Sequence, residues 1–233
     1  MNTGSTSVAR LAEEQVRTVL AAADTAPGRS AWRFECTPTT IELHETGDLT
    51  DPGHVSRVLA CGGALLNLRL AVQALGVYAD VRLAPEIERP SLLAVLRPEH
   101  ERLATTWDRG LAHMIDHRVV ETPTGPPVTA LRDMRRAADV EQAWLAPLSE
   151  PQLTSLGLPL LGDRLVVVIG SLQDEVRSLL HAGQAVQRVT LTAASFGFTT
   201  VVLGDPLATP VARRRLRAMI GGALSPHAVL SIG

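Results

Sequence analysis

Hydrophobic and polar positions follow a helical spacing at the start of the chain and alternate soon afterwards. Apolar residues three to four positions apart predict a helix over residues 7–23. Beyond Pro27-Gly28, alternation within 32–36 and 40–45 predicts a β-hairpin. Asp51-Pro52 then predicts the start of a long apolar helix that ends at Leu75, because Gly76 supplies a left-handed stop.

The remaining pattern alternates between helices and strands. The segment Ser91–Leu96 is compatible with either a strand or a short helix, and a Pro/Gly-rich connector covers residues 119–128. The other predicted elements are strands at 77–83, 165–170, 198–203 and 227–232 and helices at 128–144, 174–196 and 209–222. This order indicates an α+β or α/β sandwich with a mixed sheet flanked by helices.

One helix–strand pattern occurs twice in the chain. Residues 58–85 align with residues 179–206 without a gap, and Gly76 falls on Gly197. Two copies are too few for a solenoid. The repeat therefore predicts two pseudo-symmetric halves, residues 1–118 and 119–233, that together form one compact unit with a ligand pocket between them.

Composition excludes several classes of function. The net charge of −2 gives no reason to expect a nucleic acid or an anionic membrane as a partner. All 22 basic residues are arginine, which excludes a lysine Schiff base and a Walker-type phosphate loop. Arginine remains well suited to binding phosphate. We therefore expect a small-molecule ligand.

Localisation is predicted to be cytoplasmic. Cys36 and Cys61 are too few for a disulfide framework, and Cys61 falls on an apolar helix face as a buried thiol. The first residues lack the charged and apolar regions of a secretion signal. Arginine or asparagine interrupts every apolar stretch of transmembrane length, so no membrane association is expected.

Four short motifs follow one another along the chain: Ala26-Pro27-Gly28-Arg29-Ser30-Ala31-Trp32-Arg33-Phe34, Cys61-Gly62-Gly63-Ala64-Leu65-Leu66-Asn67, Ala182-Gly183-Gln184-Ala185 and the closing Ser231-Ile232-Gly233. In this order they resemble the nitroreductase superfamily, and within it the Acg-like group of mycobacteria and other actinobacteria. Members of that group resemble two nitroreductase halves fused in tandem. The resemblance covers residues 5–118 and 160–233.

The resemblance implies FMN bound in a groove between the halves and NAD(P)H-dependent reduction of a nitro compound or quinone. The chain departs from the family pattern as a shortened, degenerate member. A His-Asn-x-Gln segment is replaced by Gly28-Arg29-Ser30-Ala31, and an arginine-rich run before the connector keeps only Arg118 and Pro123. A flavin-storing protein without turnover, or a flavin-free scaffold that acts through a nitroreductase-like partner or a second copy, therefore remains an alternative.

Five residues are candidates for cofactor binding. Arg29 and Ser30 lie in a glycine-containing loop that could hold a phosphate, or that could be a solvated turn. Trp32 could stack on flavin, although alternation with Phe34 is more typical of core packing. Arg118 could neutralise flavin charge or form an ion pair. Asn67, which aligns with Arg188 in the repeat, could face the pocket or join the halves.

Other polar groups carry less chemistry. His113 and His117 have the spacing of two metal ligands on one helical turn, but no third ligand is identifiable, so no metal site is predicted. The arginines of 213–217 are expected to complement a helix C-terminus rather than to bind phosphate. No serine–histidine or cysteine–histidine pairing can be defended from the sequence, and catalytic residues stay unassigned.

Overall fold

The computed structural model describes residues 10–84, 88–117, 127–158, 162–204, 207 and 209–233. The chain divides into two compact units, Met1–Asp116 and His117–Gly233. Each unit combines helices with a four-stranded sheet, which makes the protein an α+β protein.

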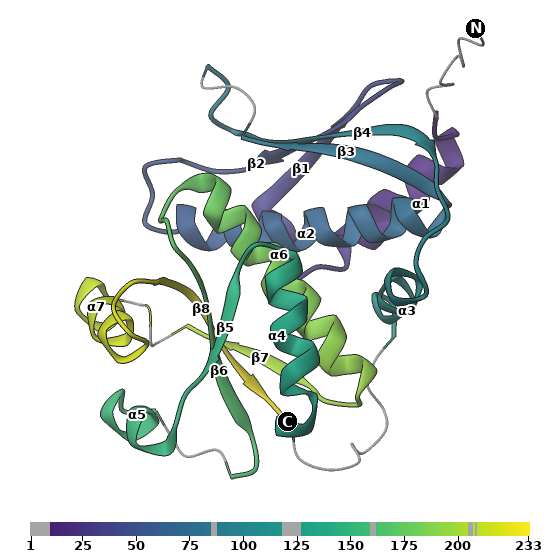
Figure 1. Ribbon diagram of the computed structural model, residues 1–233. Coiled ribbons are helices and arrows are strands. Elements are labelled where there is room, and N and C mark those ends of the chain that lie inside the picture. The colour runs from purple at the N-terminus through teal and green to yellow at the C-terminus, as the bar shows by residue number, and fades with distance from the viewer. Residues whose placement is uncertain (1–9, 85–87, 118–126, 159–161, 205–206, 208) are drawn as a thin grey trace, which may run out of the picture. The chain divides into compact units, whose positions relative to one another are not determined.

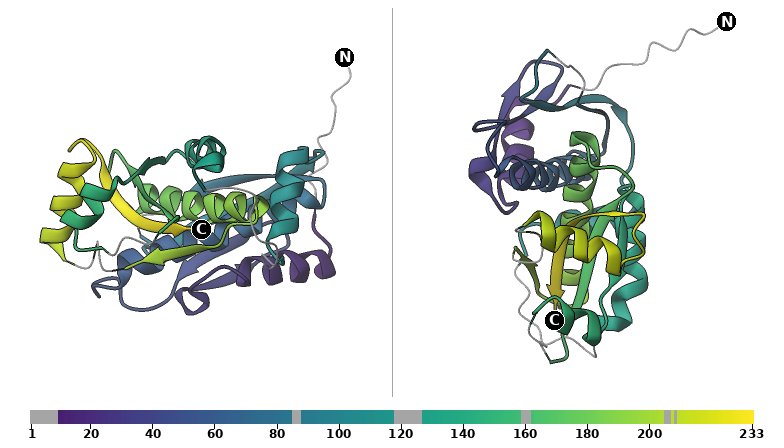
Figure 2. Two further views of the ribbon diagram at one scale, coloured as in Figure 1. Left: turned by 90° about the horizontal axis from the view of Figure 1, so that it is seen from below. Right: turned by 90° about the vertical axis from the view of Figure 1, so that its left-hand side faces the viewer.

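The first unit places α1 and α2 against one face of its sheet (Figure 1, Figure 2). Its strands lie in the order β1-β2-β4-β3. The elements are α1 (Glu13–Asp24), the 3-10 turn η1 (Arg29–Ala31), β1 (Trp32–Cys36), β2 (Ile41–Glu45), α2 (His54–Ala74), β3 (Val77–Leu83), β4 (Leu92–Glu101) and α3 (Thr106–Met114). Val19, Ile41, Leu68 and Leu96 are among the side chains that form the core between these layers.

Most elements of the first unit agree with the predictions. The β1–β2 hairpin and strand β3 are confirmed, and Gly76 ends α2 with a φ of +77°. The ambiguous segment at Ser91–Leu96 is strand, and it continues to Glu101 as β4. Helix α1 begins at Glu13 because the Gln15 side chain binds the Ala12 amide and fixes the N-terminus there.

The predicted start of α2 at Asp51-Pro52 is wrong by one short turn. The Asp51 carboxylate accepts a hydrogen bond from the Gly53 amide at 3.0 Å, which closes a turn ahead of the helix. The helix begins at His54.

Helix α2 is a core helix. Among the described residues it alone is long and apolar enough to cross a membrane, but 61% of the apolar stretch is buried inside the protein. Leu68 and Val72 pack against α1 and the sheet. Its apolar length is therefore explained by packing within the fold.

The second unit has helices on both faces of its sheet (Figure 1). Its strands lie in the order β5-β6-β8-β7. The elements are η2 (Pro127–Ala130), α4 (Leu131–Val140), β5 (Trp144–Pro147), α5 (Glu150–Ser155), β6 (Leu165–Ser171), α6 (Val176–Ser195), β7 (Thr200–Leu203), α7 (Pro210–Met219) and β8 (Ser225–Ile232). Both faces of β6 are covered, as its unbroken apolar sequence predicts, because α5 and α7 pack on the face opposite α6.

The helix predicted over residues 128–144 is shorter in the structure. Helix α4 ends at Val140, and Gln142 takes a left-handed conformation with a φ of +56°. That turn lets Trp144 begin strand β5, which pairs with β6. The sequence analysis did not predict this strand, because it assigned these residues to the end of the helix.

The prediction of a mixed sheet is wrong for the part of the chain that the structure describes. Every pairing there is antiparallel, in both sheets. Helix α2 links β2 to β3, and a helix that links two neighbouring strands usually makes them parallel partners. Here β3 lies at the edge of the sheet and pairs with β4 instead of β2. Because β4 returns between β2 and β3, no parallel pair forms.

The two units share one skeleton. Each contains a helix, two strands, a second long helix and two further strands in that order; the first unit adds α3 at its end, and the second unit adds α5 between β5 and β6 and α7 between β7 and β8. Each sheet places its fourth strand between the second and third. The sequence repeat coincides with α2–β3 in one unit and α6–β7 in the other, and Gly197 has a φ of +84° where Gly76 has +77°.

Candidate functional site

The loop that carries Arg29 and Ser30 lies directly on helix α2. Gly28 has a φ of +89°, and a Cβ there would lie 2.9 Å from the Ala60 Cβ, so glycine is required by both conformation and space. The Ala31 carbonyl accepts hydrogen bonds from the Thr46 amide at 3.0 Å and from the Cys61 thiol at 3.4 Å. These contacts hold the loop in one conformation.

The Cys61 thiol serves this structural role without becoming a nucleophile. Burial raises its pKa to about 12, and the negative charge of Glu45 acts in the same direction. The thiol therefore stays protonated and continues to donate to the loop.

Arg29 and Ser30 are exposed at the surface of the loop. The Arg29 side chain is 58% exposed, and its Nε lies 2.9 Å from Asp24 Oδ1. Its guanidinium also lies 5.8 Å from the centre of the Trp32 ring. An incoming phosphate would find a cation and a hydroxyl here, in competition with the Asp24 carboxylate.

Trp32 and Asn67 are both held inside the first unit. Trp32 is 1% exposed, and its indole Nε1 donates to Asp24 Oδ1 at 3.3 Å. Asn67 is fully buried, and its amide nitrogen donates to the Ala22 carbonyl and to Thr25 Oγ1 at the end of α1. The structure thus brings Arg29 and Trp32 together at Asp24, with Ser30 next to Arg29 in the same loop, while Asn67 ties α1 to α2. Arg118 lies outside the described residues.

FMN is the cofactor that the sequence resemblance implies. The described candidate residues fit its phosphate end but not its isoalloxazine ring. Arg29 and Ser30 could hold its phosphate through a guanidinium and a hydroxyl. Trp32 exposes no ring face for stacking, and Asn67 already directs its amide at α1. In this conformation the isoalloxazine ring would have to be bound by other groups.

An ion-pair network beside this loop was missed by the sequence analysis. The buried Glu45 carboxylate accepts hydrogen bonds from Arg57 Nε at 2.8 Å, and His54 Nδ1 lies 3.0 Å from the same oxygen. Arg57 also binds Asp51 at 2.7 Å. The hydrogen bond from the Gly53 amide lowers the pKa of Asp51 most, and the hydrogen bond from Arg57 lowers it further. The carboxylates of Asp51 and Glu45 in turn raise the pKa of Arg57. The network fixes the segment that precedes α2, next to Thr46.

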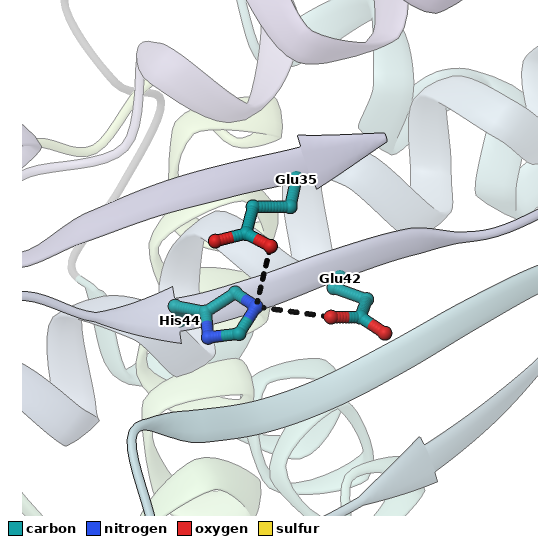
Figure 3. A group of neighbouring side chains, drawn as sticks. All are labelled: Glu35, Glu42 and His44. Atoms are coloured by element: carbon teal, nitrogen blue, oxygen red, sulfur yellow. Dashed lines mark hydrogen bonds and ion pairs between the residues drawn. The ribbon is translucent and has the colours of Figure 1, made fainter. Parts of the chain in front are cut away.

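A second polar group lies on the sheet face away from the helices. Glu35 pairs across the hairpin with Glu42, and His44 lies two residues along the same strand, so all three side chains share one face. Figure 3 shows the His44 imidazole directed at both carboxylates, with Nε2 at 3.1 Å from Glu42 and 3.8 Å from Glu35. Their ligand atoms lie within 4.8 Å of one another, a spacing that could hold a metal ion.

Two arginines already balance the charge of this group. Arg33 pairs with Glu35, and Arg89 Nη2 lies 2.5 Å from Glu42 Oε2. The hydrogen bond from Arg89 lowers the pKa of Glu42, and burial lowers the pKa of His44. With two carboxylates, two arginines and a neutral imidazole, the group is explained as a self-contained ion-pair cluster.

The two other polar motifs have structural positions. His113 lies in the last turn of α3, but His117 follows the end of that helix, so the two do not share a helical turn. On α7, Arg217 Nε donates to the Gly222 carbonyl at 2.8 Å. This contact supports the expected role of the arginine run at a helix C-terminus.

Comparison with known proteins identifies the class that the chain resembles. No protein-family model matches it. Its sequence is similar to nitroreductase-like proteins along 94% of its length.

Two relatives from Mycobacterium tuberculosis carry this similarity. "Putative NAD(P)H nitroreductase Rv3131" of strain H37Rv and "Putative NAD(P)H nitroreductase MT3217" of strain CDC 1551 are each 25% identical to the chain over 295 aligned positions, which cover 85% of each relative. Since 94% of 233 residues is about 219, roughly 76 of those positions have no counterpart in this shorter chain.

Proposed function

We propose that the chain is an FMN-binding, nitroreductase-like protein that reduces nitro compounds or quinones at the expense of NAD(P)H. The observation that carries the proposal is the similarity to putative NAD(P)H nitroreductases along nearly the whole chain. The chemistry that bound FMN supplies is acceptance of hydride from NAD(P)H and its donation to the substrate. The Gly28–Ala31 loop supports the proposal, because it presents Arg29 and Ser30 at the surface.

In the Acg-like arrangement, the two units would be pseudo-symmetric halves of one fused protein. The shared skeleton and the matching positive φ of Gly76 and Gly197 support this interpretation. A cytoplasmic location and a small-molecule electron acceptor as partner belong to the same proposal.

A flavin-free scaffold is the second candidate, and a specific observation favours it. Trp32 and Asn67 are buried and engaged in contacts within the first unit. A protein that had lost its flavin would keep such contacts for stability and would act through a partner, either a second copy or a nitroreductase-like subunit. A third alternative is a protein that binds and stores flavin but catalyses no reduction.

Flavin titration tests the proposal most directly. The absorption spectrum near 450 nm is recorded for the purified protein, and binding of FMN and of riboflavin is measured by fluorescence quenching. If Arg29 binds the phosphate, Arg29→Ala weakens FMN binding by about 10-fold or more, since a charge-assisted hydrogen bond is lost. Riboflavin binding stays unchanged because riboflavin has no phosphate.

Arg82→Ala is the matched control, because the Arg82 side chain is 68% exposed on the same unit. NAD(P)H oxidation with a nitroaromatic compound or a quinone then separates an enzyme from a flavin store. A colourless protein that leaves the fluorescence of both flavins unchanged would exclude both flavin functions and leave the scaffold.

A further inference from the structure

The second unit contains a serine–histidine pair that the sequence does not reveal. Ser171 is the last residue of β6, and His227 lies 56 positions later on the neighbouring strand β8 (Figure 1). Ser171 Oγ lies 2.7 Å from His227 Nε2. Both residues are 5% exposed, so the contact is shielded from solvent.

An irregularity in the sheet makes this contact possible. Ile169 pairs with Ala228 and Gly170 pairs with Pro226, which leaves His227 as an extra residue in a bulge. Gly170 is needed there, because a Cβ would lie 2.5 Å from the Ser225 carbonyl oxygen. A bulge changes the direction of a side chain relative to the regular alternation along a strand. Here it directs the His227 imidazole to Ser171 at the end of β6.

The charges around His227 suit a base. Burial lowers its pKa, which is the largest effect; the Asp174 carboxylate, 3.8 Å from Nδ1, and a hydrogen bond to the Gln173 backbone act in the opposite direction, and Arg213 adds to the lowering. The imidazole is therefore neutral near neutral pH and can accept a proton at Nε2. The Ser171 hydroxyl also lies 2.5 Å from the Gln173 carbonyl, so two acceptors are available for its single proton.

Ser171 lines a cavity of about 390 Å³. Trp144 and Leu172 provide apolar walls, and Glu175 and Ser178 bring the start of α6 to the same cavity. The side chain of the N-cap residue Glu175 makes no capping hydrogen bond, so it does not satisfy the first-turn amides of this 20-residue helix. Amides at a helix N-terminus stabilise negative charge, which is what develops on a carbonyl oxygen during acyl transfer.

We propose that Ser171 and His227 form an acyl-transfer site that hydrolyses small carboxylic esters. Ser171 Oγ attacks the ester carbonyl carbon as its proton passes to His227 Nε2. The bond to the leaving alcohol then breaks, and the alcohol takes that proton. Water attacks the acyl-serine with His227 again as base, which releases the carboxylic acid and restores Ser171. No electrons are gained or lost, and no residue of the proposed flavin site takes part.

Covalent labelling of the full-length protein tests the nucleophile without any variant. The protein is treated with a fluorophosphonate, and the modified peptide is identified by mass spectrometry. The expected result is one adduct, on Ser171, that is prevented by prior heat unfolding. Absence of an adduct, or an adduct on another residue alone, would overturn the proposal.

Hydrolysis of p-nitrophenyl acetate tests the reaction. Ser171→Ala and His227→Gln should each lower the rate above the buffer background by about 100-fold or more. Ser225→Ala is the matched control, because Ser225 pairs with Ser171 in the same sheet, and it should keep the rate within about 3-fold. Circular dichroism verifies that each variant is folded. A folded Ser171→Ala protein with the full rate would refute the role of Ser171.

Discussion

At the scale of single residues, Asn67 and Arg188 have equivalent roles at equivalent positions of the repeat. Asn67 donates to the end of α1. Arg188 Nε donates to Glu141, the residue that caps α4, at 2.7 Å, and both side chains of that ion pair are buried. Each residue thus joins the long central helix of its unit to the C-terminal end of the first α-helix of that unit, α1 or α4. This packing role explains why a polar side chain occupies an apolar helix.

We predict that Asn67→Ala lowers the free energy of unfolding by about 2 kcal/mol, because two hydrogen bonds to a buried amide are lost and Ala22 O and Thr25 Oγ1 lose a donor. Urea denaturation measures the change. Ser56→Ala is a suitable control, since Ser56 is exposed on the same helix. Equal stability of the two variants would show that Asn67 does not hold α1 to α2.

At the scale of elements, the β6–β8 pair depends on one glycine. A side chain at position 170 would meet the Ser225 carbonyl and also the Trp144 ring, whose Cζ2 would lie 2.9 Å from the new Cβ. Backbone on the neighbouring strand cannot move aside without opening the bulge that places His227.

Gly170→Ala should therefore destabilise the protein by about 2 kcal/mol or more, as overpacking against backbone does. Gly204→Ala should change the stability by less than about 0.5 kcal/mol, since a Cβ there would meet no described atom within 4 Å. Thermal unfolding of the two variants beside the parent protein gives the comparison. A tolerated alanine at position 170 would contradict this account of the bulge.

At the scale of the whole molecule, each unit buries one histidine whose protonation opposes folding. Burial lowers the pKa of His44 in the first unit and of His227 in the second. His44 is surrounded by Glu35, Glu42, Arg33 and Arg89, and His227 lies near Asp174 and Arg213. A group with a lowered pKa in the folded state binds its proton first in the unfolded state.

The melting temperature is therefore predicted to be constant above about pH 7.5 and to fall as the pH drops through the unfolded histidine pKa of about 6.5. The loss should continue down to the lower pKa values of the folded protein. His44→Gln and His227→Gln should each flatten the decline between about pH 7 and pH 5. His100→Gln, at an exposed histidine, serves as the control. A decline of unchanged slope in the double variant would assign the pH dependence to other groups.

The sequence predicted elements better than their pairing. The hairpin, the strand at Val77–Leu83 and the glycine stop at Gly76 followed from short-range patterns, because adjacent residues determine them. Strand β5 at Trp144–Pro147 was missed, since four residues carry too little alternation to stand out from the preceding helix. For the candidate site, the pattern identified the Arg29-Ser30 loop but could not show that Asp24 pairs with Arg29 and Trp32.

The sequence by itself determined the alternation of helices with strands, the repeated helix–strand segment and the glycine stop at Gly76, because each depends on local conformation. Only the tertiary structure decided that both sheets are antiparallel in the described residues, since pairing depends on where distant strands meet. Only the tertiary structure brought Ser171 to His227 and joined Glu35, Glu42 and His44 with their two arginines. Cross-strand register and a single bulge residue fix these contacts, and neither leaves a periodic signal in the sequence.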